Sequence, residues 1–243
     1  MHAHTNILRG RWSLIATVAM VLVGHLATTE PAFALTYSAK SISAVVIDAD
    51  TKQPLSDVNV LVVWELQDSN ASSESTWVFM EAITDKNGHF AFSGWGPKVV
   101  PQSLRELPRR LGPEQPTFYL FKSGYLFGIE ANPWESWMLG NRAWTGDLIR
   151  SSVWNGKTFE LEKFAGSNGQ YLDRLSMTAG GLPMQACRWA QIPMLTAALV
   201  KERGDRIKFP ATSSLPTMKS LEEKAKSVPG CPSPQVVLAP YLK

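Results

Sequence analysis

Histidine and cysteine are scarce in this chain of 243 residues, and their scarcity excludes several kinds of site. Three of the four histidines lie within the first 25 residues, so His89 is the only one in the remainder, and Cys187 and Cys231 are the only cysteines. A structural zinc site usually needs four Cys or His ligands, more than this remainder contains. A Ser-His-Asp or Cys-His catalytic device would have to depend on His89. No second His motif accompanies it, so we expect His89 to be a strand residue that faces water.

A strong charge of either sign is also lacking, as are long apolar runs beyond the N-terminus. The chain has 24 Lys and Arg against 21 Asp and Glu, a net charge of +3, and its basic residues are scattered. This balance gives no electrostatic footprint for nucleic acid, so we expect no nucleic-acid partner. No run after the leader is long enough to span a bilayer.

The N-terminal 34 residues have the three parts of a secretory signal peptide. Arg9 and Arg11 form a short positive region, and residues 12–27 form an apolar run of about 16 residues. Ala32-Phe33-Ala34 is an A-x-A cleavage site. A spanning helix usually needs about 20 apolar residues, so an uncleaved anchor is the less favoured alternative. We therefore predict a signal peptide over 1–34, transient membrane contact, and a protein secreted to the periplasm or the extracellular medium.

Residues 41–130 alternate short apolar runs with turn residues, a pattern typical of an all-β module. The run 58–66 is apolar enough to predict burial on both faces. Asn87-Gly88 supplies the positive-φ positions that a tight hairpin needs. The proline-rich insertion near 94–116 predicts a long loop or a short helix. The expected strands cover 41–49, 58–66, 76–83, 89–92, 118–122 and 125–130.

Three blocks in this module resemble the carboxypeptidase regulatory-like family. Residues 46–60 read V-x-D-x-x-T-x-x-P-L-x-x-V-x-V, residues 84–90 read T-D-x-x-G-x-F, and residues 122–125 read K-x-G-Y. The resemblance covers roughly residues 40–130. It implies a transthyretin-like Greek-key β-sandwich of about seven strands. It also implies a non-catalytic role, because regulatory-like domains that accompany peptidases are not themselves catalytic.

Beyond the module, the pattern becomes helical. Residues 157–163 alternate as a strand that could complete the sandwich, and Ser167 can cap a helix to about residue 177. A second helix is expected from Pro193 to Gly204, and a third over 217–226. We therefore predict a mainly β fold, with the β-sandwich at 35–165 and a small C-terminal helical extension at 166–243.

The tryptophans offer the best lead to a ligand. Aromatic rings in loops can stack on sugars, or they can pack a segment onto the sandwich. Both interpretations stay open for the Trp-rich segment 132–156, where the candidate ligand-binding residues are Trp134, Trp137, Trp144 and Trp154.

The two cysteines and the turn carboxylates have structural interpretations. Cys187 and Cys231 are an even pair in a chain predicted to be exported, so we expect a disulfide bond between them. Asp48/Asp50 and Asp85/Asn87 could converge as Ca²⁺ ligands, but Asp and Asn are also the residues expected in turns. We predict no metal, no cofactor and no catalytic residue.

These observations favour a non-catalytic, exported cell-envelope protein that acts as a binding or structural module. Its expected partner is an unknown envelope protein or a glycan. A carbohydrate-binding module that uses the Trp-rich segment 132–156 is the alternative. A transthyretin-like hydrolase comes third, since the hydroxyisourate hydrolases resemble this chain in architecture and no residue of their active sites carries over to it.

Overall fold

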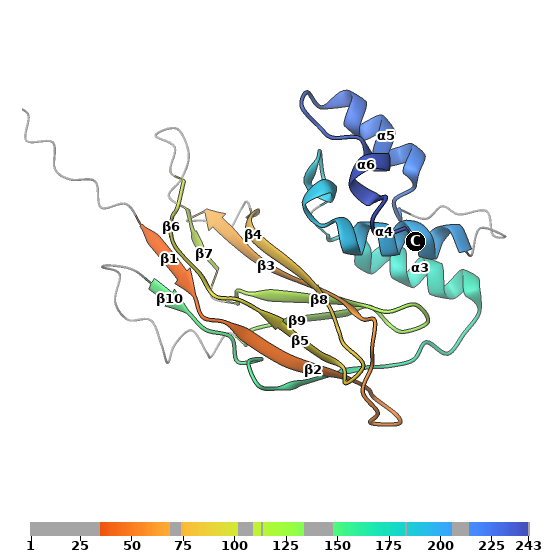
Figure 1. Ribbon diagram of the computed structural model, residues 1–243, viewed down its shortest axis with the longest axis horizontal. Helices are drawn as coiled ribbons and strands as arrows, with labels where there is room; N and C mark the ends of the chain where they lie inside the picture. The colour runs from red at the N-terminus through yellow and green to blue at the C-terminus, as the bar shows by residue number, and fades with distance from the viewer. Residues whose placement is uncertain are drawn as a thin grey trace, which may run out of the picture. The chain divides into compact units, whose positions relative to one another are not determined.

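The computed structural model describes residues 35–68, 74–101, 109–112, 114–133, 148–182, 184–205 and 214–242. These residues belong to one unit, Leu35–Lys243 (Figure 1). The predicted signal peptide, residues 1–34, lies outside the described residues, and the division between 35–165 and 166–243 stays a prediction.

Eleven strands of the described chain form three hydrogen-bonded sheets. The first sheet has the order β10-β1-β6, with β10 at Leu148–Arg150, β1 at Thr36–Ala39 and β6 at Trp95–Val99. The second has the order β11-β2-β5, with β11 at Thr158–Leu161, β2 at Ile42–Asp48 and β5 at His89–Phe92. The third has the order β4-β3-β8-β9, with β4 at Glu74–Ile83, β3 at Asn59–Asp68, β8 at Thr117–Phe121 and β9 at Gly128–Ala131. A short strand, β7 at Arg109–Leu111, also pairs with β3.

The first two sheets are built from the same stretches of chain, because β1 continues into β2 and β5 continues into β6. Two residues, Lys40 and Ser41, separate β1 from β2, and Ser93 and Gly94 separate β5 from β6. A Cβ atom at Gly94 would lie only 2.7 Å from the carbonyl oxygen of Ala39, so the two segments approach too closely here for a side chain. These interruptions divide long segments into shorter strands, which explains why more strands are found than the about seven expected of such a sandwich.

The sandwich core lies between the first two sheets and one face of the third. Phe90 of β5, Phe118 of β8 and Phe159 of β11 meet there, with ring centroids 5.2 Å apart for Phe118–Phe159 and 5.9 Å apart for Phe90–Phe159. The predicted strand at 157–163 completes the sandwich as β11, which pairs in parallel with β2. Its alternating pattern buries Phe159 and Leu161, as period-two patterning requires.

The second face of the third sheet is covered by helices. Leu61 and Val63 of β3 pack against helix α3 (Asn168–Ala179) and helix α4 (Pro193–Asp205), which lie on this side of the sheet in Figure 1. All five residues from Val60 to Trp64 are buried, which confirms the prediction of burial on both faces. Ser167 caps α3 through a capping box with Gln170, as its position predicted.

A third core holds the end of the chain together. Trp189 of the short helix η1 (Arg188–Gln191) is fully buried with Leu221 of helix α5 (Met218–Ser227) and Leu238 of helix α6 (Pro234–Leu238). The fold class predicted from the sequence, a mainly β sandwich followed by a small helical extension, is therefore confirmed.

The proline-rich insertion near 94–116 was expected to be a loop or a short helix, and this expectation is wrong for its described parts. It contains β6 and β7. Pro97 is tolerated in β6 because β6 lies at the outer edge of its sheet, where a missing backbone N–H breaks no ladder of hydrogen bonds.

Candidate binding groove along β4

The three sequence blocks come together as turns of the sandwich. The Thr84 hydroxyl donates to the carbonyl oxygen of Leu55 (2.7 Å) and accepts from the Val58 N–H (2.9 Å), which joins the second block to the first. The Tyr125 hydroxyl donates to Asp48 Oδ2 (2.9 Å), which joins the third block to the first. The polar side chains of Thr84, Asp48 and Tyr125 in these blocks therefore act as structural ties.

The turn carboxylates are satisfied by their own backbone. Asp48 Oδ1 accepts from the N–H groups of Asp50 and Thr51, and the Thr51 donor in particular lowers the Asp48 pKa. Asp85 Oδ1 accepts from the N–H groups of Asn87 and His89 (both 2.9 Å), and the His89 donor lowers the Asp85 pKa. Both carboxylates therefore stabilise their own turns by accepting backbone N–H groups. No group of three or more His, Cys, Asp or Glu in the described chain could hold a metal ion.

Of the four candidate tryptophans, the structure describes Trp154 alone. Its half-buried ring stacks on Phe159, with centroids 4.7 Å apart and planes inclined by 23°. Its Nε1–H donates to the Ala131 carbonyl oxygen (3.1 Å). Trp154 therefore packs the segment onto the sandwich, whereas Trp134, Trp137 and Trp144 lie outside the described residues.

A groove of about 630 Å³ runs along β4, an edge strand that pairs only with β3 in the described chain. Four consecutive residues of β4 line it, together with one residue of β6 and two of η1. The lining residues are Thr76, Trp77, Val78, Phe79, Lys98, Arg188 and Gln191.

A break in register turns Trp77 toward the sandwich. Trp64 of β3 pairs with Val78, but the next residue, Glu65, pairs with Thr76, so Trp77 is the additional residue of a β-bulge. The bulge brings both Trp77 and Val78 against the sandwich core, where strict alternation would bring one of them. Nothing in the sequence pattern indicates this irregularity, and Thr76 to Ile83 was expected simply to be a strand.

The Trp77 ring is enclosed on several sides. It makes edge-to-face contacts with Tyr37 of β1 (6.1 Å between centroids) and with Trp95 of β6 (5.4 Å). The ammonium nitrogen of Lys98 lies 5.2 Å from the ring centroid, in a cation–π contact. The Trp77 ring is thus part of the wall of the groove rather than an open platform.

Two cations reach the groove from different elements. Lys98 is exposed, and its Nζ donates to the Trp77 carbonyl oxygen at 3.4 Å. Arg188 is half-buried, and no residue of the described chain forms an ion pair with its guanidinium. None of the described residues that line the groove is acidic, although the Thr76 hydroxyl donates to Glu65 on the neighbouring strand (3.3 Å). The lining therefore carries positive charge.

A half-buried carboxylate holds the helical wall of the groove, which is η1 with Arg188 and Gln191, in position. Glu81 of β4 accepts the first N–H groups of α4, with Oε1 2.7 Å from the Leu195 nitrogen and Oε2 3.0 Å from the Met194 nitrogen. Burial raises the Glu81 pKa to about 7, although both N–H donors act in the opposite direction. Since η1 immediately precedes α4, this clasp fixes Arg188 and Gln191 beside β4.

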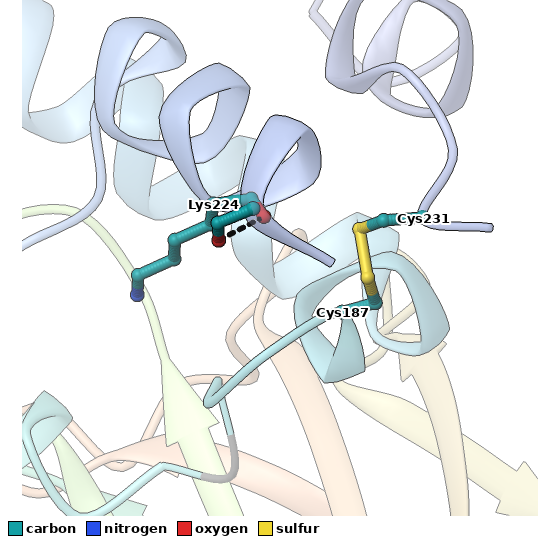
Figure 2. The surroundings of a disulfide bond; sticks show 4 residues. Cys187, Lys224 and Cys231 are labelled. Carbon is teal, nitrogen blue, oxygen red and sulfur yellow. Dashed lines mark hydrogen bonds between the residues drawn. A yellow bond between two sulfur atoms is a disulfide. The ribbon is translucent and has the colours of Figure 1, made fainter. Parts of the chain in front are cut away.

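The expected disulfide is present and holds the other end of η1. Figure 2 shows Cys187, the residue before η1, joined to Cys231, which follows α5. The two Cα atoms are 5.6 Å apart, within the usual range. The position of Arg188 is therefore set by a covalent tie on one side and by the Glu81 clasp on the other.

No sequence pattern marked the residues that define this groove. Trp77 and Lys98 lie in separate segments, and Arg188 follows them by about ninety or more positions in the chain. No motif joins them. The nearest sequence signal was Cys187, because the disulfide predicted there would restrain the chain directly before Arg188.

His89 is exposed on β5, as expected. Its backbone N–H completes the Asp85 turn, and the described residues that line the groove do not include it. No helix in the described part of the chain combines the length and the apolar character needed to cross a membrane.

Comparisons with known proteins give no relative from which a function could be transferred. No family model matches the chain, and no curated protein matches it. Solved structures with some similarity include a 3-chlorocatechol 1,2-dioxygenase from Rhodococcus opacus (16% identity, TM-score 0.28, 54% of this chain and 61% of that one). They also include the shaft pilin SpaA from Lactobacillus rhamnosus GG (12% identity, TM-score 0.24, 54% of this chain and 47% of that one). This chain thus spans less than two thirds of either protein, and at these TM-scores the likeness carries no argument.

Proposed function

We propose that this chain is a non-catalytic, exported cell-envelope protein that acts as a binding module, built on a sandwich of the carboxypeptidase regulatory-like type. The family assignment is supported by the three sequence blocks, whose polar residues tie the turns of the sandwich together through Thr84 and through Asp48–Tyr125. Export is supported by the predicted signal peptide and by the Cys187–Cys231 disulfide, a bond typical of oxidising compartments.

The groove along β4 is the observation that carries the binding role. Grooves that combine apolar surface with a few fixed polar or charged groups are the usual form of binding sites. Here the apolar surface comes from Trp77 and Phe79 and the charge from Lys98 and Arg188. The Glu81 clasp and the disulfide hold the helical wall in place before any ligand arrives, which lowers the entropic cost of binding.

The other two candidates receive no support from a specific observation. The carbohydrate-binding alternative depended on four tryptophans, of which Trp154 packs against Phe159. The hydrolase would depend on His89. In the described chain, the backbone N–H of His89 stabilises the turn at Asp85. Neither candidate is therefore preferred to a protein-binding module.

A crosslinking experiment in cells tests the proposed function. A photo-reactive amino acid replaces Gln191, which is exposed in the groove, and in a matched strain it replaces Lys224, which is exposed on α5. Irradiation of intact cells should give discrete adducts at position 191, absent at position 224, in the envelope fraction. Identical adduct patterns at both positions, or a protein retained in the cytoplasm, would contradict the proposal.

A further inference from the structure

We propose that the groove binds an acidic, extended polypeptide segment, which adds as a strand to the outer edge of β4. This inference rests on the proposed binding function and names the class of partner. In strand addition, main-chain hydrogen bonds to an exposed sheet edge supply affinity, and side-chain pockets supply specificity.

The edge of β4 has the geometry for strand addition. β4 pairs with β3 alone in the described chain, and its lining residues Thr76–Phe79 are consecutive, which is expected when a groove follows the backbone itself. The Lys98 ammonium reaches the Trp77 carbonyl oxygen from another sheet, so this carbonyl is accessible from outside the β3–β4 ladder. Four residues of strand correspond to about 13 Å, enough for a short peptide segment.

The charges of the lining select an acidic segment. Lys98 and Arg188 both contribute to the groove, and none of the described lining residues offsets them. Carboxylates of an added strand could accept hydrogen bonds from both cations. Such charge complementarity favours the right partner and disfavours basic ones.

Lys98 adds a second element of selectivity. Lysines and β-bulges are common protections of edge strands, and both occur at Trp77: the bulge is in β4 itself and the lysine, Lys98, comes from β6. A neutral strand that pairs here must displace the Lys98 ammonium from the Trp77 carbonyl and offers it no new partner. An acidic strand displaces it and supplies a carboxylate, so the same lysine resists non-specific pairing and admits the acidic segment.

A polypeptide fits these contacts better than a sugar. Stacking of a sugar ring needs an open aromatic face, but Tyr37, Trp95 and Lys98 surround the Trp77 ring. The accessible feature is the backbone of β4, which a peptide can pair with. The structure therefore favours strand addition over carbohydrate stacking.

The test measures affinity for defined peptides by calorimetry, with the disulfide-bonded chain that starts at Leu35. The probes are peptides of about six residues that alternate Glu, Ser or Lys with Val, and a Glu peptide with alternate backbone nitrogens methylated. The Glu peptide should bind most tightly. Lys98→Gln and Arg188→Gln should each weaken it by about two- to fivefold, as expected for partly exposed ion pairs. Methylation should weaken it by about tenfold or more, because the ladder cannot form.

Matched variants control for changes in overall charge. Lys224→Gln and Arg174→Gln remove the same charges from exposed positions on α5 and α3, and they should leave the Glu-peptide affinity unchanged. Lys98→Gln should also narrow the preference for the Glu peptide over the Ser peptide. Thermal melts of all four variants verify that each one folds.

Several results would overturn the inference. These are no binding of the Glu peptide, equal binding of the Glu and Lys peptides, undiminished binding of the methylated peptide, or equal effects of groove and control variants. An acidic oligosaccharide, oligogalacturonate, is titrated in parallel. If it binds through Lys98 and Arg188 and the peptide does not, the strand-addition inference fails while the proposed binding function stands. If crosslinking at position 191 also gives no specific adduct, both fail.

Discussion

Glu81 offers the sharpest test of how the helical wall is held, because its two kinds of environment predict opposite behaviour. Its carboxylate accepts two N–H groups at the start of α4, which favours the ionised form. Its burial between β4 and α4 favours the neutral form. The pKa of about 7 means that burial outweighs the two hydrogen bonds.

The raised pKa makes the folded state less stable as the pH rises. In the unfolded chain Glu81 titrates near its usual pKa of 4.5, so below that pH both states are protonated and the contribution to stability is fully present. The contribution is lost as the pH rises through about 7. At 1.36 kcal/mol per pKa unit, the loss amounts to about 3 kcal/mol.

The substitution Glu81→Gln removes this dependence. Glutamine resembles the protonated carboxyl group: it keeps one oxygen acceptor for α4 and cannot ionise. We expect the free energy of unfolding of the native chain, relative to the Gln variant, to fall by about 3 kcal/mol between pH 4.5 and about pH 8. Denaturant unfolding of both proteins at several pH values measures the difference.

The comparison of variants isolates Glu81 from other titrating groups. Asp48 and Asp85 have pKa values held low by backbone N–H donors, so they titrate below this range. Glu130, whose pKa burial raises, is present in both proteins and cancels in the difference. Glu223→Gln on α5, an exposed position, serves as the matched control and should show no such trend. A gain in stability of the native chain over the Gln variant as the pH rises would refute this prediction, because the N–H donors would then dominate over burial.

Three further predictions concern the disulfide, one tryptophan and export. Replacing both Cys187 and Cys231, 44 positions apart, by serine should lower the free energy of unfolding by about 4 kcal/mol in the chain-entropy model; an unchanged denaturation midpoint would contradict this. Trp154→Ala should cost about 3 kcal/mol in stability and leave a glycan-binding screen unchanged, whereas an unperturbed melt with lost binding would restore the carbohydrate alternative. N-terminal sequencing of the exported protein should begin at Leu35, and an intact Met1 would disprove cleavage.

Local patterns predicted the elements of this fold well, because each depends on neighbours in sequence. Ser167 marked the start of α3, and alternation at 157–163 marked β11. The doubly apolar run at 58–66 predicted a strand covered on both faces, and the structure supplies a sheet on one side and helices on the other. Periodicity reports which faces are buried, which is why these predictions are confirmed.

The candidate site could not be predicted in the same way, because it depends on contacts between distant segments. The sequence pointed to tryptophans that cluster along the chain, yet Trp154 packs against Phe159. The ring in the groove wall is Trp77, which lies in a strand with no unusual sequence feature. Arg188 lies beside it only because Glu81 binds the start of α4 and Cys231 fixes Cys187. Neither tie has a spacing that a sequence pattern could reveal.

The disulfide also changes what proteolysis can do to this protein. The bond closes a covalent loop that begins at Cys187, includes η1, α4 and α5, and ends at Cys231. A single cut anywhere inside this loop opens the chain but releases nothing, because both products stay joined through sulfur. Such a nicked protein would keep its apparent mass on a non-reducing gel and separate into two fragments only after reduction. The helical wall of the groove can therefore lose one peptide bond to a protease and remain attached to the sandwich.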